Sequence, residues 1–225
     1  MGAFRLFVEN QFMEATPPGK KRIAIFDFDD TLVFTPSPES GAKDYTIATG
    51  KPWHINDRET ALAHGFPASF RRTGWWGRTE TLDNPDIFKA TEDKLNQEVA
   101  QAFHAFKNDP ETYVVVMTGR TAKFEKIVKD ILTKYNIHAD EYIFKTGNAD
   151  TFVFKANTII HRLMTPEIQS VEIFDDRNEH IPQFVELGRK LLDEIGENFG
   201  KKWPKLQDVV IHDVRQNQNH VLRPR

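Results

Sequence analysis

The sequence predicts an α/β fold, a three-layer sandwich in which helices cover both faces of a central parallel, Rossmann-like sheet of about five strands. Two observations carry this prediction. Runs of β-branched and aromatic residues recur along the chain, and segments with apolar residues at helical spacing separate most of them. Strands that alternate with helices are typical of parallel sheets, whose two faces are both covered.

The first apolar run covers residues 22–28 and is apolar at successive positions, which is typical of a central strand. It follows the turn-forming sequence Pro17-Pro18-Gly19. Further strands are expected at residues 113–117, 141–144, 171–174 and 208–214.

Apolar residues at helical spacing predict four helices that pack on this sheet. The first is expected to begin with Asn84 as N-cap and Pro85 at the first helical position, and its apolar residues run on to Phe106. The other three are expected within residues 124–132, 159–163 and 181–192.

Residues 34–84 interrupt this alternation, because glycines and prolines break every long periodicity there. We expect a small cap insertion after the first strand, since long insertions in compact domains are usually lids or binding segments. Its aromatic residues, Trp53, Phe66, Trp75 and Trp76, argue against disorder. The predicted parts are the α/β core at 20–33 and 85–215, the cap at 34–84, an N-terminal segment at 1–19 and a polar, flexible tail at 216–225.

The composition excludes several classes of site. The 225 residues carry a formal net charge of -3 and include no cysteine. Disulfides, thiolate metal sites and a cysteine nucleophile are therefore excluded, and a reducing, cytoplasmic location is expected. The balanced charge means that nucleic acid would have to be bound by a local patch. No apolar run is long enough for a membrane span, so no membrane contact is expected, and the sequence carries no signal of oligomeric state.

Acidic residues directly follow the first predicted strand. Asp27, Asp29 and Asp30 lie where the carboxyl edge of a parallel sheet opens into a ligand crevice. Three adjacent carboxylates repel one another unless a hard cation such as Mg²⁺ neutralises them. An isolated Asp-x-Asp would instead be interpreted as a solvated turn with a helix cap, but the rest of the chain favours the metal site.

Two further strand ends carry chemical groups. Thr118-Gly119-Arg120 offers a hydroxyl and backbone amides to an anion, and Asp175-Asp176-Arg177 brings a second acidic pair to the same edge. Lys155 lies between these motifs along the chain and is available to neutralise a phosphate, although Lys145 also follows a strand.

Taken in order, these motifs resemble those of the haloacid-dehalogenase superfamily of phosphohydrolases, which are Asp-x-Asp-x-Thr, a Ser or Thr, a Lys, and an acidic pair. Asp27-Phe28-Asp29-Asp30-Thr31 matches the first motif, and Thr118 matches the second. We assign the lysine to Lys155, because Lys145 lies closer to its preceding strand than the motif of this family usually does.

The resemblance implies a role for each matched residue. Asp27 would attack phosphorus and become an aspartyl phosphate, and Asp29 would be the general acid and base. Thr118 and Lys155 would bind the phosphate oxygens. Mg²⁺ would be held by Asp27, the backbone carbonyl of Asp29, and Asp175 or Asp176.

A closer resemblance involves the insertion. Phe34-Thr35-Pro36-Ser37-Pro38, Thr73-Gly74-Trp75-Trp76, Lys155 and Phe174-Asp175-Asp176-Arg177 are similar to the haloacid-dehalogenase domain of Swiss Army Knife RNA repair proteins. The similarity spans most of residues 22–214. Thr73 stands where this family usually has a second glycine.

Several residues are candidates for substrate binding. Trp75 and Trp76 could stack on a base or sugar, whereas at least one of them is expected to pack in the core of the cap. Gly119 belongs to the predicted phosphate loop. Arg120 could clamp the phosphate or bridge to the acidic cluster, and for Arg177 the bridge is favoured.

These features lead to three hypotheses about function. The first is a Mg²⁺-dependent phosphatase that acts on a phosphorylated substrate, a terminal phosphate of RNA or DNA. The second is a phosphatase for a nucleotide or sugar phosphate, because a fold does not name its substrate. The third is a noncatalytic binding module, which the retention of all four motifs argues against.

Overall fold

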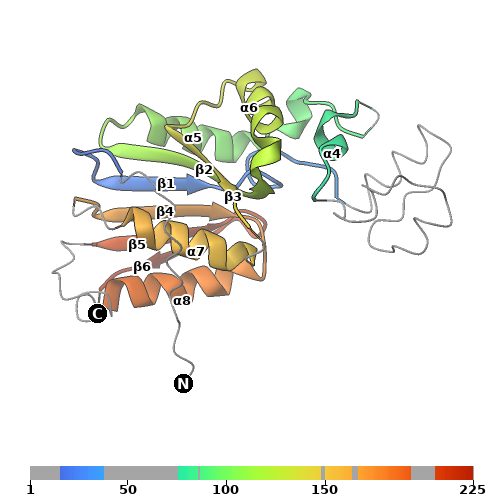
Figure 1. Cartoon of the computed structure of the whole chain (residues 1–225). Helices are drawn as coiled ribbons and strands as arrows, with labels where there is room; N and C mark the ends of the chain where they lie inside the picture. Colours follow the sequence, from blue (N-terminus) through green and yellow to red (C-terminus); the bar gives the residue numbers. More distant parts are fainter. Residues whose placement is uncertain are drawn as a thin grey trace.

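The computed structural model describes residues 16–37, 76–85, 87–147, 150–163, 167–193 and 206–224. These residues form a central sheet with helices on both faces, which confirms the predicted α/β class (Figure 1). The sheet has six strands in the described part of the chain, in the order β3-β2-β1-β4-β5-β6. The strands are β1 (Arg22–Phe26), β2 (Thr112–Thr121), β3 (Glu141–Lys145), β4 (Ser170–Asp175), β5 (Asp208–Asp213) and β6 (Gln218–Leu222).

The first strand lies in the middle of the sheet, as its apolar sequence predicts. β1 pairs in parallel with β2 on one side and β4 on the other, so that Phe26 lies opposite both Val116 and Phe174. β3 and β5 extend the parallel sheet, and β6 pairs antiparallel with β5. The carboxyl ends of five strands therefore meet at one edge.

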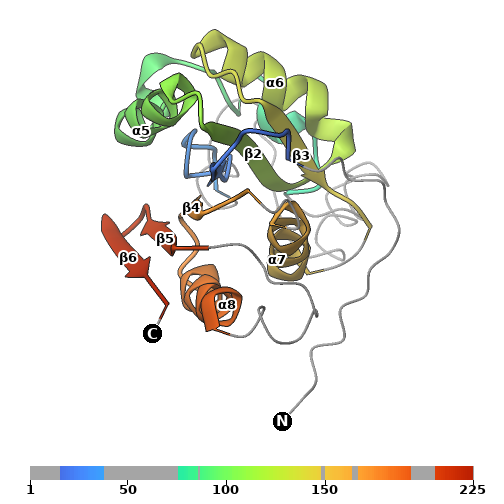
Figure 2. The same cartoon turned by 90° about the vertical axis from the view of Figure 1, so that its left-hand side faces the viewer.

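Each face of the sheet packs against its own pair of helices (Figure 2). Ile23 and Ile25 of β1 share a buried cluster with residues of α7 (Thr151–Arg162) and α8 (His180–Asp193). Ala24 and Phe26 share the opposite cluster with residues of α5 (Gln97–Asn108) and α6 (Glu125–Lys134). This alternation is the two-residue period of a strand that is buried on both faces.

A row of stacked rings crosses three strands beneath the carboxyl edge. Phe26 stacks on Phe174 with ring centroids 4.4 Å apart, and Phe174 stacks on His212 at 3.8 Å. Phe103 of α5 packs edge-on against Phe26 at 5.2 Å. Because Phe26 and Phe174 each precede an acidic motif, this packing fixes the strand ends from which those motifs leave the sheet.

The helix that was expected to begin at Asn84 begins later. Asn96 is the N-cap of α5, and its side chain accepts a hydrogen bond from the backbone N–H of Val99. The preceding residues hold two short helices, α4 (Glu80–Asp83) and η1 (Glu92–Lys94). Leu95 is extended and forms a bridge with Val33, so pairing with the loop after β1 takes precedence over the helical spacing.

The expectation of a flexible tail at 216–225 is also wrong, because residues 218–222 form β6. Leu222 pairs with Val209 and is buried, whereas its neighbour Val221 is 52% exposed. The segment is polar because only one face of this edge strand packs against α8, and a single buried leucine gives little hydrophobic signal.

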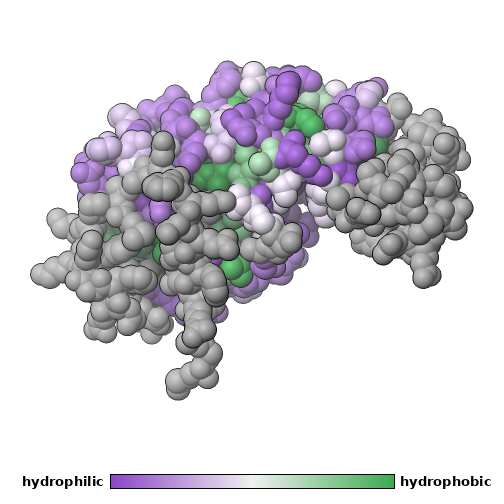
Figure 3. All heavy atoms as spheres, in the orientation of Figure 1, coloured by the Kyte–Doolittle hydropathy of each residue, from purple (hydrophilic) through white to green (hydrophobic). Residues whose placement is uncertain are grey.

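The predicted cap at 34–84 falls largely outside the described residues, which include only 34–37 and 76–84 of it. α4 belongs to the described part and lies beyond the arrowhead of β1 (Figure 1). Another short helix, η2 (Ala122–Phe124), follows β2. The outer surface along α6 is mostly hydrophilic (Figure 3), and none of the described helices is long and apolar enough to span a membrane.

We predict that Leu222→Ala lowers the free energy of unfolding by about 2–5 kcal/mol, because it leaves a cavity between β6 and α8. Val221→Ala is the matched control and should change it by less than about 1 kcal/mol, because Val221 is half exposed. Urea denaturation of both variants measures the difference. A loss of stability in Leu222→Ala no larger than that in Val221→Ala would contradict the packing of Leu222 in the core.

Candidate active site

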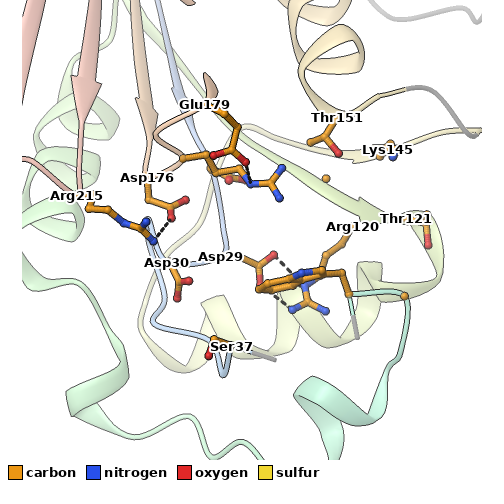
Figure 4. A pocket seen from close by; sticks show the side chains of 15 residues that line it. Asp29, Asp30, Ser37, Arg120, Thr121, Lys145, Thr151, Asp176, Glu179 and Arg215 are labelled. Atoms are coloured by element: carbon orange, nitrogen blue, oxygen red, sulfur yellow. Dashed lines mark hydrogen bonds and ion pairs between the residues drawn. The ribbon is translucent and has the colours of Figure 1, made fainter. Parts of the chain in front are cut away.

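Residues of the first, second and fourth motifs line one cavity at the carboxyl edge of the sheet (Figure 4). Its volume is about 470 Å³. The first motif follows β1, the second lies at the end of β2, and the fourth follows β4. The residues in its walls include Asp27, Asp29, Gly119, Arg120, Asp176 and Arg177.

Lys155 lies between two carboxylates at the centre of this site. Its Nζ is 2.9 Å from Oδ2 of Asp27 and 2.6 Å from Oδ2 of Asp175. All three side chains are buried. Lys145 also lines the cavity but forms no ion pair with another described residue. The geometry therefore favours Lys155 over Lys145 as the cation of the site.

Local structure holds the three groups together. The backbone N–H of Asp27 donates to the carbonyl of Phe174 at 3.0 Å, which ties the end of β1 to the end of β4. Asp150 caps α7 by accepting from the backbone N–H groups of Phe152 and Val153. This cap starts the helix one turn before Lys155, whose side chain then reaches the sheet edge.

Burial and neighbouring charges shift the pKa values of these groups in different directions. Burial raises the pKa of Asp27 to about 6; Lys155 opposes the rise, and the charges of Asp175 and Asp29 add to it. Burial also acts to raise the pKa of Asp175, but Lys155 and His180 outweigh it and hold that pKa well below its usual range. The pKa of Lys155 is raised, because the two carboxylates outweigh its burial.

Three carboxylates of the site are close enough to share a cation. Asp27, Asp175 and Asp176 each offer an oxygen, and these oxygens lie within 4.8 Å of one another. Oδ1 of Asp27 is buried and has no hydrogen-bond partner among the described residues. Burial raises the pKa of Asp176 to about 7, with added repulsion from Asp27 and Asp175. The donor set fits Mg²⁺, which prefers carboxylate oxygens and would relieve this repulsion.

Asp29 faces away from that cluster and pairs with Arg120. Nε of Arg120 lies 3.0 and 2.9 Å from the two carboxylate oxygens of Asp29, and Nη2 lies 2.7 Å from Oδ1. The arginine side chain is 2% exposed. Nη1 donates to the hydroxyl of Thr81 in α4, so Arg120 joins the first motif to the cap. Of the two roles predicted for Arg120, the structure shows the ion pair with an acidic residue of the first motif.

The second motif forms a tight loop at the end of β2. The hydroxyl of Thr118 is buried and accepts from the backbone N–H of Arg120 at 3.1 Å. A Cβ at Gly119 would lie 2.8 Å from Cγ2 of Thr151, so a side chain there would require Thr151 to move. The backbone at Gly119 therefore lies close to the first residue of α7.

The remaining substrate-binding candidates lie at the rim. Trp76 is 40% exposed, with its ring 5.4 Å from the guanidinium carbon of Arg120, and Trp75 lies outside the described residues. Arg177 also lines the cavity, with Nε 3.7 Å from Glu179 and Nη1 3.3 Å from Nε2 of His180. Arg177 therefore forms an ion pair, as expected, but with Glu179 and not with the carboxylates of the motifs.

Three residues that support the site were not among the predicted catalytic, metal-binding or substrate-binding residues. The hydroxyl of Thr35 donates to Oδ1 of Asp29 at 2.8 Å. His180 is buried, with Nδ1 3.3 Å from Oδ1 of Asp175. Arg215, in the turn between β5 and β6, has Nη2 3.5 Å from Oδ2 of Asp176. The sequence offers an indication for Thr35 and His180, because each lies a few residues after a motif, but none for Arg215.

We predict that Asp176→Asn flattens the pH dependence of stability in protein freed of divalent metal. The folded pKa values of Asp27 and Asp176, about 6 and 7, exceed the ordinary 3.8, so the native state binds more protons than the unfolded state between pH 4 and 7. The free energy of unfolding therefore falls as the pH rises through this window. Urea denaturation at pH 5 and pH 8 measures the fall.

Asp176→Asn removes the contribution of Asp176, so the free energy of unfolding should differ less between pH 5 and pH 8 than it does in the wild type. Asp83→Asn, at an exposed position of α4, is the control and should retain the wild-type difference. An unchanged pH dependence in Asp176→Asn would contradict the raised pKa. Mg²⁺ should stabilise the wild type more at pH 8 than at pH 5, because it binds ionised carboxylates.

Two solved structures are distantly similar to the chain. No curated protein sequence matches the chain. A chain in the structure of a Pnkp1/Rnl/Hen1 complex is 16% identical, with a TM-score of 0.42, over 78% of this chain and 46% of that one, so this chain spans about half of its length. A haloacid-dehalogenase-like family hydrolase from Streptococcus pneumoniae is 15% identical, with a TM-score of 0.39, over 76% of this chain and 82% of that one.

A family model decides the assignment. Residues 57–222 match the model described as haloacid-dehalogenase (HAD) domain family 1 in Swiss Army Knife RNA repair proteins. This range includes the second, third and fourth motifs and most of the chain, and the resemblance noted from the sequence is confirmed. The chain belongs to the HAD domain family of Swiss Army Knife RNA repair proteins.

Proposed function

We propose that the protein is a Mg²⁺-dependent phosphatase that removes a terminal phosphate from a nucleic acid through an aspartyl phosphate at Asp27. One observation carries the proposal: a buried lysine lies between the carboxylates of Asp27 and Asp175, and Asp176 completes a group of three carboxylates beside it. So many charges are costly to bury without a function. The arrangement suits a dianionic ligand with a metal cation.

In the proposed reaction the carboxylate of Asp27 attacks phosphorus in line with the leaving oxygen. The P–O bond to the leaving group breaks, and the phosphoryl group is transferred to Asp27. Lys155 orients the carboxylate of Asp27 and neutralises an equatorial phosphate oxygen. The backbone around Thr118 and Gly119 offers further donors. When bound at Asp27, Asp175 and Asp176, Mg²⁺ would offset the charge of these carboxylates and of the phosphate.

Asp29 would move the proton. It would donate a proton to the leaving oxygen and then accept one from the water that hydrolyses the aspartyl phosphate, which releases inorganic phosphate and restores Asp27. Arg120 and Thr35 hold the carboxylate of Asp29 from two directions, so its orientation is fixed before substrate binds. We treat both as positioning residues, because they would act through Asp29.

Two observations support a nucleic-acid end as the substrate. The family model is named for RNA repair proteins. Trp76 lies at the rim of the cavity, is 40% exposed, and could stack on a terminal base or sugar while the phosphate reaches Asp27. The second candidate function, a phosphatase of a small metabolite, is favoured by the cavity volume of about 470 Å³, which is in the range of small-molecule sites.

Asp27→Asn should abolish phosphate release, because an amide oxygen cannot serve as the nucleophile. We would measure Mg²⁺-dependent release from 3′- and 5′-phosphorylated oligonucleotides, nucleotides and sugar phosphates. We expect oligonucleotides to be preferred and the activity of Asp27→Asn to be at least about 10³-fold lower. Preference for a small phosphate would exclude end repair, and phosphate release that survives the substitution would exclude Asp27 as nucleophile.

Arg120→Lys should lower kcat by about 10- to 100-fold with little change in KM, because a lysine cannot keep the two-pronged contact with Asp29 and the bond to Thr81. Arg223→Lys is the matched control, since Arg223 is exposed and does not line the cavity. It should keep kcat within about threefold. A loss in Arg223→Lys as large as that in Arg120→Lys would contradict the positioning role of Arg120.

A further inference from the structure

The cavity contains one cationic side chain that the proposed reaction does not use. Four cationic side chains contribute to its walls, namely Arg120, Lys145, Arg177 and Arg215. Three of them are paired with carboxylates, those of Asp29, Glu179 and Asp176 respectively. Among the described residues, Lys145 alone of these four has no ion pair. Lys145 contributes to the lowered pKa of Asp150, but less than the backbone N–H groups that Asp150 caps.

An irregularity in the sheet places the hydroxyl-bearing residue Thr121 beside Lys145. β2 and β3 are in register up to Thr118 and Phe144, and the next pair is Thr121 with Lys145. Gly119 and Arg120 are therefore extra residues in β2, a bulge of the kind that redirects side chains near active sites. The bulge turns Arg120 toward Asp29 and sets Thr121 beside the end of β3.

Thr151, the first residue of α7, completes the group. Its side chain packs against Gly119, so it touches the loop that is proposed to bind the phosphate. Figure 4 shows Thr151, Lys145 and Thr121 on the side of the cavity away from Asp176 and Arg215. One cation and two hydroxyls, all half-buried in the cavity wall, are donors suited to an anion.

This group is separate from the position of the phosphate under attack. β3 lies two strands from β1, so the backbones at Lys145 and Asp27 are at least about 10 Å apart. Lys155, not Lys145, contacts Asp27. A ligand that fills both places must carry two anionic groups, one at Asp27 and one at Lys145.

We infer that Lys145, Thr121 and Thr151 form a second phosphate subsite, and that the substrate is a phosphomonoester with another phosphate group about one nucleotide away. This inference rests on the proposed phosphatase function and narrows its substrate class. Two sources offer this chemistry: a nucleoside 3′,5′-bisphosphate, and the 3′-phosphorylated end of a strand whose next phosphate is a diester. The subsite binds the second phosphate without reacting with it.

The test compares substrates that differ by one phosphate. We would measure kcat/KM of the full chain with Mg²⁺ for adenosine 3′-monophosphate, adenosine 3′,5′-bisphosphate and a 3′-phosphorylated dinucleotide. The wild type should prefer at least one of the two substrates with a second phosphate. Lys145→Ala should lower kcat/KM for the preferred substrate about tenfold more than for the monophosphate.

Lys134→Ala is the matched control, because Lys134 is an exposed cation at the end of α6 and does not line the cavity. It should leave the ratio between substrates unchanged. Loss of preference for the dinucleotide identifies a strand phosphate as the ligand, and loss of preference for the bisphosphate identifies a small molecule. Equal losses for all three substrates in Lys145→Ala, or a wild type without preference, would overturn the subsite.

A binding measurement separates this inference from the proposed reaction. In the Asp27→Asn background, titration calorimetry with adenosine 3′,5′-bisphosphate and with the 3′-monophosphate needs no turnover. Lys145→Ala should reduce the affinity ratio of the two ligands about tenfold. A reduced affinity ratio, if the wild type releases no phosphate, would support the subsite and reject the phosphatase. An unchanged affinity ratio, if the wild type does release phosphate, would support the phosphatase and reject the subsite. Lys145→Gln replaces Lys145→Ala if the alanine variant does not fold.

Discussion

The ion pairs of Lys155 are the interaction on which the site depends. Two carboxylates at the ends of adjacent strands would repel each other strongly, because both are buried and only weakly screened by water. The ammonium group between Asp27 and Asp175 makes their proximity tolerable. It does not contact Asp176, whose pKa is raised to about 7 by burial and further by repulsion from Asp27 and Asp175. The protein fold thus supplies one cation, and the remaining charge fits a second cation supplied by the solvent.

The sheet order explains how motifs far apart in sequence come together. β1 lies between β2 and β4, so the first motif has the second on one side and the fourth on the other. The helix that carries Lys155 covers the face toward which Asp27 and Asp175 point. The same order places β3 on the far side of β2, which brings Lys145 to the opposite wall of the cavity from Arg215.

The parallel sheet and the positions of the motifs could be predicted, because apolar runs mark buried strands and the residues that follow them must lie at one edge. Interactions that depend on distant partners could not. The start of α5 is set by the bridge between Leu95 and Val33, and the strand at 218–222 is set by pairing with β5. The sequence favoured Lys155 over Lys145, and Lys155 lies beside Asp27 in the structure. No local pattern indicated that Arg120 would pair with Asp29 and not remain open to a ligand.

The hairpin of β5 and β6 connects the last part of the chain to the carboxylate cluster of Asp27, Asp175 and Asp176. Arg215 lies in its turn and approaches Asp176, while Leu222 anchors the returning strand against the core. Trimming the chain just after Arg215 would remove the strand but leave the arginine, with its backbone no longer held in a turn. A truncated protein could then keep every motif residue and still bind cations differently, so a bulky tag fused at this end is best separated from β6 by a flexible linker.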